Sequence, residues 1–557
     1  MIVITGLANF ISLSETSESI LQKASRLISP ASTHPILISE LAKHRRIAVV
    51  THSSKRANEI AHELSALRED VIEFPAWETL PHEKLSPNSD TVAKRVSALY
   101  NVESANLIVL PIRALVQPIN SDVIKTPPLE LKIGTNIGFE KLAKELIRRA
   151  YSRVDLVERR GEFTVRGGII DIFPPDSDYP IRLDFFGDEL EEIFKFEIGS
   201  QRTFGENLTS VRLLPCRELL IDEEVMQRAE VLRRQYPESI ELLDKVSQGV
   251  YADGMEALIG ALHPEMKQFL DFLPRDFEIV LLEEERIRNR TLDLIKTSEE
   301  FLEAAWSNTA NQDGSVAPLR EALQRGGYLE LSDVEVRAGE LGMTWRSINL
   351  FGDVDEPIIE QFGEITPYRG DVDRLISDLK SWLNAGELIV LAFRGSGLTE
   401  RYQQLLSEAD TPARRVNKVE PSTPRDAVYL LTTTLSSGFE DRTNKIILLA
   451  ESDITGIKDR RAASSKMPSR RKKAIDPLEL NRGDYVVHEI HGVGRYQELI
   501  KRSVGGVERE YVVIEYAPSK RGQPADRIYV PTDALELVTR YVRSEEHTSE
   551  LQSRFGI

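Results

Sequence analysis

The stretch GEFTVRGGIIDIFPP, residues 161–175, decides how the middle of this 557-residue chain is interpreted. Its glycines, together with Arg166 and the arginines just before it, first suggest a loop that cradles phosphate. Such a loop leads into the N-terminus of a helix, and no helical pattern follows here. The residues alternate and then become mostly apolar. They predict a strand whose paired glycines mark a bulge or a close approach of another backbone.

A second predicted strand, PIRLDFFGDE at residues 180–189, gives this stretch a partner. If the two strands pair, Arg166 and Arg182 are presented close together, with Phe186 just beyond. Exposed arginine beside an aromatic residue is a common composition of protein-interface hot spots. Ion pairs of these arginines with neighbours such as Asp171 and Asp184 explain the pattern equally well. The residues alone leave a docking surface and an internal ion-pair network both open.

Length and composition limit the class of protein. A chain this long predicts three to five domains, and 41% hydrophobic with 29% charged residues is typical of a soluble globular protein. No apolar run approaches the ~20 residues of a membrane span, and the first residues lack the features of a signal peptide. The single cysteine, Cys216, excludes a disulfide framework. We therefore expect a cytoplasmic protein.

The charge is strongly negative overall but uneven. A net charge of −18 argues against a protein whose whole surface binds nucleic acid. Residues 458–473 carry eight Lys or Arg and one acidic residue, Asp459. A solvated linker explains this segment better than a DNA-facing one, although both fit.

The coarse pattern along the chain is α/β. Apolar strands predicted at 46–52, 71–75 and 106–111 alternate with helical segments, which favours a parallel sheet covered on both faces. Closely spaced strands and turns between 127 and 216 favour an antiparallel sheet. Further strands at 386–393, 426–434 and 444–451 indicate a second α/β unit. Three β-rich runs after residue 477 are typical of a small β-barrel.

No nucleotide-hydrolysing site is recognisable. A P-loop requires Gly-x-x-x-x-Gly-Lys-Ser/Thr, and the chain contains no Gly-Lys pair. Gly6 stands where such a loop could begin, and FRGSGLTERY at 393–402 is better explained as a tight turn from strand to helix. His488 and His491 are too few, and too poorly spaced on a strand, for a zinc site. We predict no catalytic residue, no cofactor and no metal in this chain.

Several motifs resemble one known family. Residues 161–203 resemble the domain that excinuclease B shares with the bacterial transcription-repair coupling factor. FPAWETLPHEKLSP at 74–87 and AESDITG at 450–456 are similar to the coupling factor specifically. The last β-rich region resembles the CarD-like RNA-polymerase-interacting domain of that family. The resemblance covers residues 1–542 in order.

The resemblance implies partners and residues. Members of the family displace RNA polymerase stalled at a DNA lesion with an ATP-driven double-stranded-DNA translocase, and they recruit excinuclease A. The positions that match the excinuclease A contacts are Arg166, Arg182 and Phe186, with Arg153 by analogy to excinuclease B. The polymerase β subunit is implied to pair with a strand edge, and the matching residues are Leu499, Ile500, Lys501, Arg502, Ser503 and Val504.

The family also implies a division of the chain, with a motor that would follow it. The expected parts are an excinuclease-B-like α/β domain in two pieces (1–126 and 217–345), an inserted antiparallel α+β domain (127–216), a second α/β domain (346–453), a basic linker (454–477), a Tudor/SH3-like β-barrel (478–542) and a tail (543–557). The tail resembles a translated sequencing-library adapter and is predicted to be non-native. ATP and Mg²⁺ are expected only in the motor.

Two other functions remain as alternatives. An excinuclease B, which binds damaged DNA, would need a P-loop lysine near Gly6 and a tyrosine-rich hairpin after residue 81, and the sequence has neither. A stand-alone polymerase-binding regulator would leave the first ~450 residues unexplained.

Overall fold

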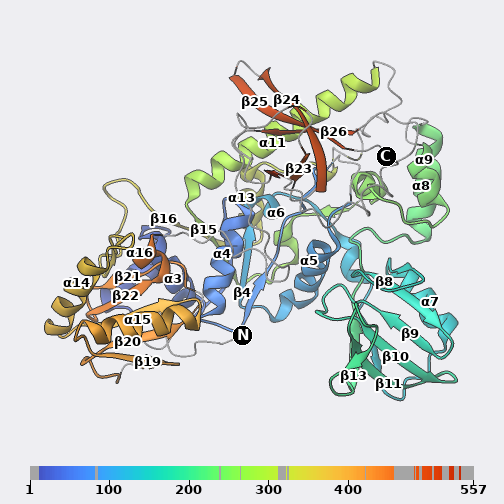
Figure 1. Ribbon diagram of the computed structural model, residues 1–557. Coiled ribbons are helices and arrows are strands. Elements are labelled where there is room, and N and C mark those ends of the chain that lie inside the picture. Colours follow the sequence, from blue (N-terminus) through green and yellow to red (C-terminus); the bar gives the residue numbers. More distant parts are fainter. Residues whose placement is uncertain are drawn as a thin grey trace. The chain divides into compact units, whose positions relative to one another are not determined.

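The computed structural model describes residues 12–81, 86–236, 240–263, 265–310, 322, 325–420, 422–433, 435–456, 482, 485–488, 492–504, 507–516, 526–531 and 538–540. The chain divides into two compact units, Met1–Ala463 and Ser464–Ile557. Figure 1 labels many of the elements of each unit. The basic segment 458–473, Gly6 and the tail 543–557 lie outside the described residues.

A six-stranded parallel sheet forms the centre of the first unit. Its order is β1-β16-β15-β2-β4-β3, and every neighbouring pair is parallel. The strands are β1 (Arg26–Ile28), β2 (Arg46–Thr51), β3 (Val71–Glu73), β4 (Leu107–Pro111), β15 (Phe277–Leu282) and β16 (Thr344–Asn349). The α/β class expected from the apolar runs is confirmed.

Helices cover both faces of this sheet, as the continuous apolar strands require. On β2, Ile47 and Val49 belong to one buried cluster, and Ala48 and Val50 to another. The first cluster includes residues of α3 (His34–Leu41) and α4 (Ser54–Ser65). The second includes residues of α5 (Ser89–Asn101), α6 (Ile112–Leu115), α11 (Glu284–Ala310) and α13 (Leu331–Glu340).

A second α/β sheet shares a core with the first. Its order is β17-β21-β22-β18-β20-β19, from β17 (Phe362–Glu364), β18 (Leu388–Phe393), β19 (Ala413–Val416), β20 (Val428–Thr432), β21 (Phe439–Asp441) and β22 (Ile446–Ala450). One face packs in the same cluster as α3 and α4. The other is covered by α14 (Val372–Asn384), α15 (Ser396–Glu408) and α16 (Glu451–Thr455).

An antiparallel region lies between β4 and β15 in the chain. It contains a six-stranded sheet, β12-β11-β10-β9-β8-β7, in which every neighbouring pair is antiparallel except β7 with β8. One face of this sheet packs with α7 (Phe139–Arg148). Its strands are β7 (Ser152–Arg153), β8 (Glu162–Arg166), β9 (Ile169–Ile172), β10 (Ile181–Phe186), β11 (Glu189–Phe196) and β12 (Thr203–Phe204). A separate pair, β6 (Leu129–Lys132) with β13 (Ser210–Leu213), begins and ends the region.

The stretch 161–175 is a hairpin and not one strand. Strands β8 and β9 pair antiparallel, with Arg166 opposite Ile169. Gly167 has a φ of +58°, which L side chains rarely adopt. The expectation of a bulge within one strand is therefore wrong, because this conformation turns the chain back in a two-residue loop. The expected close approach occurs at Gly168, where an added Cβ would lie 3.1 Å from the carbonyl oxygen of Phe185.

The return from the antiparallel region to β15 is mostly helical. It contains α8 (Glu223–Gln235), α9 (Ile240–Ser247) and α10 (Ile259–Leu262). The helix α2 (Glu15–Lys23) precedes β1, and the short strands β5 (Ile119–Asn120) and β14 (Met266–Lys267) pair antiparallel. No helix of the described residues is long and apolar enough to cross a membrane.

The second unit contains a five-stranded antiparallel sheet in the order β26-β25-β24-β23-β27. The strands are β23 (Tyr485–His488), β24 (Gly492–Val504), β25 (Val507–Tyr516), β26 (Asp526–Pro531) and β27 (Val538–Arg540). The domain borders given above stay predictions, and the one at 345/346 falls inside β16.

A buried carboxyl on α4 makes stability depend on pH. Glu63 is 3% exposed, and its Oε1 has no hydrogen-bond partner among the described residues. Burial raises the pKa of Glu63 to about 7. Between its unfolded pKa and this value the folded chain binds more protons than the unfolded chain, so stability falls as pH rises.

We predict that Glu63→Gln stabilises the fold above pH 7, on the order of 1–3 kcal/mol, and changes little near pH 4.5. Denaturant unfolding at both pH values checks this, with the exposed Glu103→Gln, which does not act on Glu63, as control. An effect of Glu63→Gln that is equal at both pH values would contradict the assignment.

Candidate protein-interaction surfaces

The strand register brings three of the sequence-predicted residues to one face of the antiparallel sheet. Arg166 is opposite Ile169, and Ile169 is opposite Asp184. Arg182 and Phe186 lie two residues on either side of Asp184, and side chains alternate between the faces of a strand. The residues that alternate with them, Ile181, Leu183 and Phe185, are buried. Arg166, Arg182 and Phe186 therefore share the face opposite the α7 core, which we call the open face.

Two hairpin tips fix the edge of the open face. The β8–β9 tip is bound to β10, because the amide of Phe185 donates to the Gly168 carbonyl at 2.9 Å. The β10–β11 tip is bound to the loop before α7, because the amides of Ile137 and Gly138 in that loop donate to the Asp188 carbonyl. Arg166 and Phe186, the last residues of β8 and β10, are thus carried on anchored backbone.

Phe186 has the exposure of a contact residue. Its side chain is 76% exposed, whereas Phe185 beside it is buried in the α7 core. A large aromatic side chain left in water at the end of a strand contributes little to the fold. It is the kind of anchor that interface hot spots use.

The arginines have different surroundings. Arg166 is exposed, and one Nη donates to the Asp155 carbonyl at 2.6 Å. Arg153 is exposed on β7, at the far edge of the sheet. Arg182 instead bonds Asp171 through Nε at 2.7 Å and through one Nη at 2.8 Å. The ion pair that the sequence left open is therefore present for Arg182.

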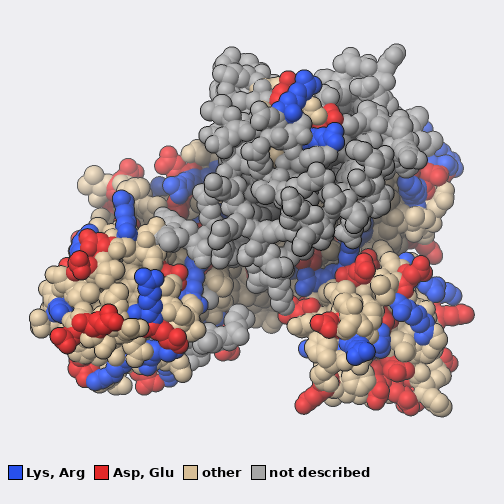
Figure 2. Space-filling model, in the orientation of Figure 1, with Lys and Arg blue, Asp and Glu red and all other residues tan. Residues whose placement is uncertain are grey.

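Asp171 explains why Arg182 is held in place. This carboxylate is 2% exposed, and its hydrogen bonds raise the pKa of Arg182. The guanidinium also lies 5.0 Å from the centre of the Phe196 ring. Figure 2 shows that acidic side chains are frequent over the antiparallel region, and those of Asp188, Glu189, Glu191 and Glu192 are exposed. The arginines of the open face are therefore close in the sheet to exposed acidic side chains.

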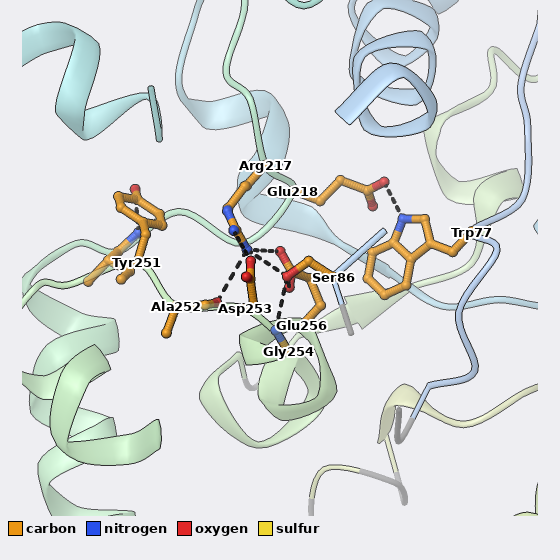
Figure 3. A network of polar contacts seen from close by, with 10 residues as sticks. Trp77, Ser86, Arg217, Glu218, Tyr251, Ala252, Asp253, Gly254 and Glu256 are labelled. Atoms are coloured by element: carbon orange, nitrogen blue, oxygen red, sulfur yellow. Dashed lines mark hydrogen bonds and ion pairs between the residues drawn. The ribbon is translucent and has the colours of Figure 1, made fainter. Parts of the chain in front are cut away.

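A buried ion pair fixes the chain where it leaves the antiparallel region. Arg95 on α5 and Glu218 are 0% and 1% exposed, and Arg95 donates to both carboxylate oxygens. Trp77 donates its indole N–H to the same carboxylate at 2.8 Å (Figure 3). Arg95 also bonds the Pro75 carbonyl at 2.9 Å and lies over the Phe74 ring. The motif FPAWETLP thus binds Glu218 through Trp77 and holds its partner Arg95 through Phe74 and Pro75.

The neighbouring residue binds a second carboxylate. Arg217 bonds Glu256 at 2.7 Å and the hydroxyl of Ser86 at 3.0 Å, and Gly254 donates to that hydroxyl (Figure 3). Sequence reasoning missed Arg95, Arg217 and Glu218. The only signal was the position of Trp77 in a motif already noted.

The edge of β24 is the second candidate surface. Its residues 495–504 pair with β25, whereas its other side pairs with β23 only from Gly492 to Arg495. Among the described strands none pairs with that side of 496–504, which includes the six residues that the resemblance implies for polymerase binding. A strand with one open side can accept another strand.

The strand-to-helix loop after β1 is closed by its own residues. The Ser29 and Thr33 hydroxyls are 2.6 Å apart, and His34 is 0% exposed with Nε2 3.3 Å from the Ser29 carbonyl oxygen. Burial lowers the pKa of His34 to about 3, so it carries no charge at neutral pH. A phosphate-binding loop needs open space and a cation instead. Within the described residues, no group of three or more His, Cys, Asp or Glu could hold a metal.

Comparisons with known proteins match two segments of the chain and nearly its whole length. Residues 129–219 match the family described as UvrB interaction domain, and residues 480–542 match the CarD-like/TRCF RID domain. Transcription-repair-coupling factors of Mycobacterium tuberculosis and Mycobacterium bovis are each 35% identical over 97% of this chain and 46% of their own length. That of Escherichia coli is 26% identical over 93% of this chain and 45% of its own. The chain thus spans about half the length of these relatives.

We predict that Glu218→Ala destabilises the first unit by about 3–5 kcal/mol, because it leaves Arg95 buried without a counter-ion. Thermal or denaturant unfolding measures the change. The exposed Glu223→Ala is the control and is expected to shift stability by less than about 0.5 kcal/mol. Equal stability of Glu218→Ala and wild type would show that the pair does not fix this junction.

Proposed function

The chain belongs to the transcription-repair-coupling factor family, as its N-terminal part, and we propose that it links RNA polymerase stalled at DNA damage to nucleotide excision repair. In this proposal the antiparallel region recruits excinuclease A, and the second unit binds the polymerase β subunit. One observation supports it: each matched domain has a surface of the kind that its partner would need. The first has exposed side chains at two hairpin tips, and the second has a strand with an unpaired side.

The case for excinuclease A rests on the open face. The residues matched to the UvrB interaction domain include Arg153, Arg166, Arg182 and Phe186. Phe186 and Arg166 lie exposed on the anchored tips. We also propose that 127–216 is a domain inserted into the first α/β domain, because the parallel sheet resumes with β15 after it.

The case for the polymerase rests on β24. Its open side lies within the residues matched to the CarD-like/TRCF RID domain, and adding a strand supplies backbone hydrogen bonds without a deep pocket. We propose that the five-stranded sheet belongs to a small β-barrel. The polymerase strand would pair with residues 499–504.

We propose that this part of the factor works without a cofactor. The missing Gly-Lys pair and the filled loop after β1 support the absence of an ATP site. ATP-driven translocation on double-stranded DNA would then reside in the half of the relatives that this chain does not span, and the protein would act in the cytoplasm. An excinuclease B is the less favoured alternative, because the relatives and the polymerase-interacting match point to the coupling factor.

We predict that Arg166→Ala and Phe186→Ala each weaken binding of excinuclease A at least about tenfold, as expected for hot-spot residues. The unfolding transition should stay unchanged, because both side chains are exposed. Calorimetry or surface plasmon resonance with the purified chain measures the affinity.

Matched controls exist on the same sheet. Arg202→Ala and Phe204→Ala remove an exposed arginine and a 41% exposed phenylalanine from its other edge. These variants should bind like wild type. If all four variants bound equally, the assignment of the open face would fall.

We predict that a proline scan across residues 499–504 affects polymerase binding with a period of two. Proline removes one backbone N–H, and successive amides of a strand point to opposite sides. Substitutions on the open side should weaken polymerase binding and leave unfolding nearly unchanged. Those on the β25 side should lower the melting temperature. A uniform effect along the segment would contradict strand addition.

A further inference from the structure

The two arginines of the open face are bonded differently, although they lie on one surface. Arg182 is held by the two Asp171 oxygens, by the Gln201 carbonyl at 3.3 Å and by the Phe196 ring. Three of the five guanidinium N–H groups are thus used, and one hydrogen on each Nη is left. The side chain remains 20% exposed. Arg182 therefore presents a small donor edge in one fixed orientation.

The charge of Arg182 is already compensated. A carboxylate as buried as that of Asp171 is strongly stabilised by a cation beside it, and Arg182 is its ion-pair partner at 2.7 Å. Asp184, on the same face, acts on Arg182 in the same direction. Arg182 thus adds almost no net positive charge to the open face.

Arg166 keeps its charge. Its bond goes to a neutral backbone carbonyl, that of Asp155, and no carboxylate forms an ion pair with it in the part of the chain that the structure describes. In the strand register the nearest carboxylate is that of Asp184, one strand beyond Ile169. A guanidinium in this situation attracts a carboxylate of a partner more strongly than one that is paired.

We propose that Asp171 is a positioning residue of the docking face, which orients Arg182 and neutralises it. Arg182 then donates to an uncharged acceptor of the partner, such as a backbone carbonyl oxygen. Arg166 provides the charge and pairs with a carboxylate of the partner. The inference rests on the proposed function, because it assigns separate roles within the surface for excinuclease A.

A double-mutant cycle on the complete chain tests the positioning role. Affinity for excinuclease A is measured for Asp171→Asn, Arg182→Gln and the double variant, and unfolding is recorded for each. Asp171→Asn keeps the size of the side chain and removes the charge. It should weaken binding about tenfold when Arg182 is present, and less than about twofold when Arg182 is glutamine. Asp184→Asn, an acid of the same face that acts on Arg182 without a hydrogen bond, should show a much smaller dependence on Arg182.

Salt dependence tests the division of charge. Attraction between exposed charges weakens as the ionic strength rises. Arg166→Gln should therefore flatten the salt dependence of the affinity. The double variant Asp171→Asn/Arg182→Gln should keep the slope of wild type, because it removes one charge of each sign.

The outcomes separate this inference from the proposed function. If wild type does not bind excinuclease A, the proposed function fails. If wild type binds but Asp171→Asn costs the same with and without Arg182, Asp171 acts only through stability and the positioning role is overturned. The positioning role would also be overturned if Asp171→Asn bound with wild-type affinity. The division of charge would be overturned if the double variant Asp171→Asn/Arg182→Gln changed the salt dependence of the affinity as much as Arg166→Gln does.

Discussion

A buried carboxylate that stays charged needs a cation or hydrogen-bond donors beside it, and Arg95 supplies both to Glu218 at a junction. Glu218 follows the last strand of the antiparallel region, and Arg95 lies on α5, which packs against the parallel sheet. Trp77 adds a third bond from the segment after β3. Three parts of the chain therefore meet at one carboxylate. The placement of the antiparallel region's exit depends on it.

The same physical rule operates inside the antiparallel sheet, with another consequence. Asp171 is buried and binds Arg182, so an arginine that could have been a mobile surface charge becomes part of the sheet. Arg166, without such a partner, stays available, and Phe186 extends from the second tip. The open face thus combines one arginine fixed by an ion pair with an exposed arginine and an exposed phenylalanine on the same sheet. This combination suits recognition of a protein partner.

Local patterns predict most of the elements, but contacts distant in sequence are out of their reach. The apolar runs predicted at 46–52, 71–75 and 106–111 contain β2, β3 and β4 of the parallel sheet, because burial on both faces leaves a continuous signal. The Gly167–Gly168 pair misleads, since paired glycines fit a bulge within one strand as well as a turn between two. Arg95 and Glu218 are 123 residues apart, and no local pattern couples them. The ion pair of Arg182 is one of two interpretations that the sequence leaves open, because alternation reveals the face of a strand and not the partner of a side chain.

We propose that excinuclease A docks on the open face at the two hairpin tips. Hydrogen–deuterium exchange of the complete chain, with and without excinuclease A, detects such docking without any substitution, because backbone amides report contact. On binding, exchange should slow at residues 166–169 and 184–188 and stay unchanged in α7 on the opposite face. Protection confined to α7, or to any surface away from the tips, would contradict it.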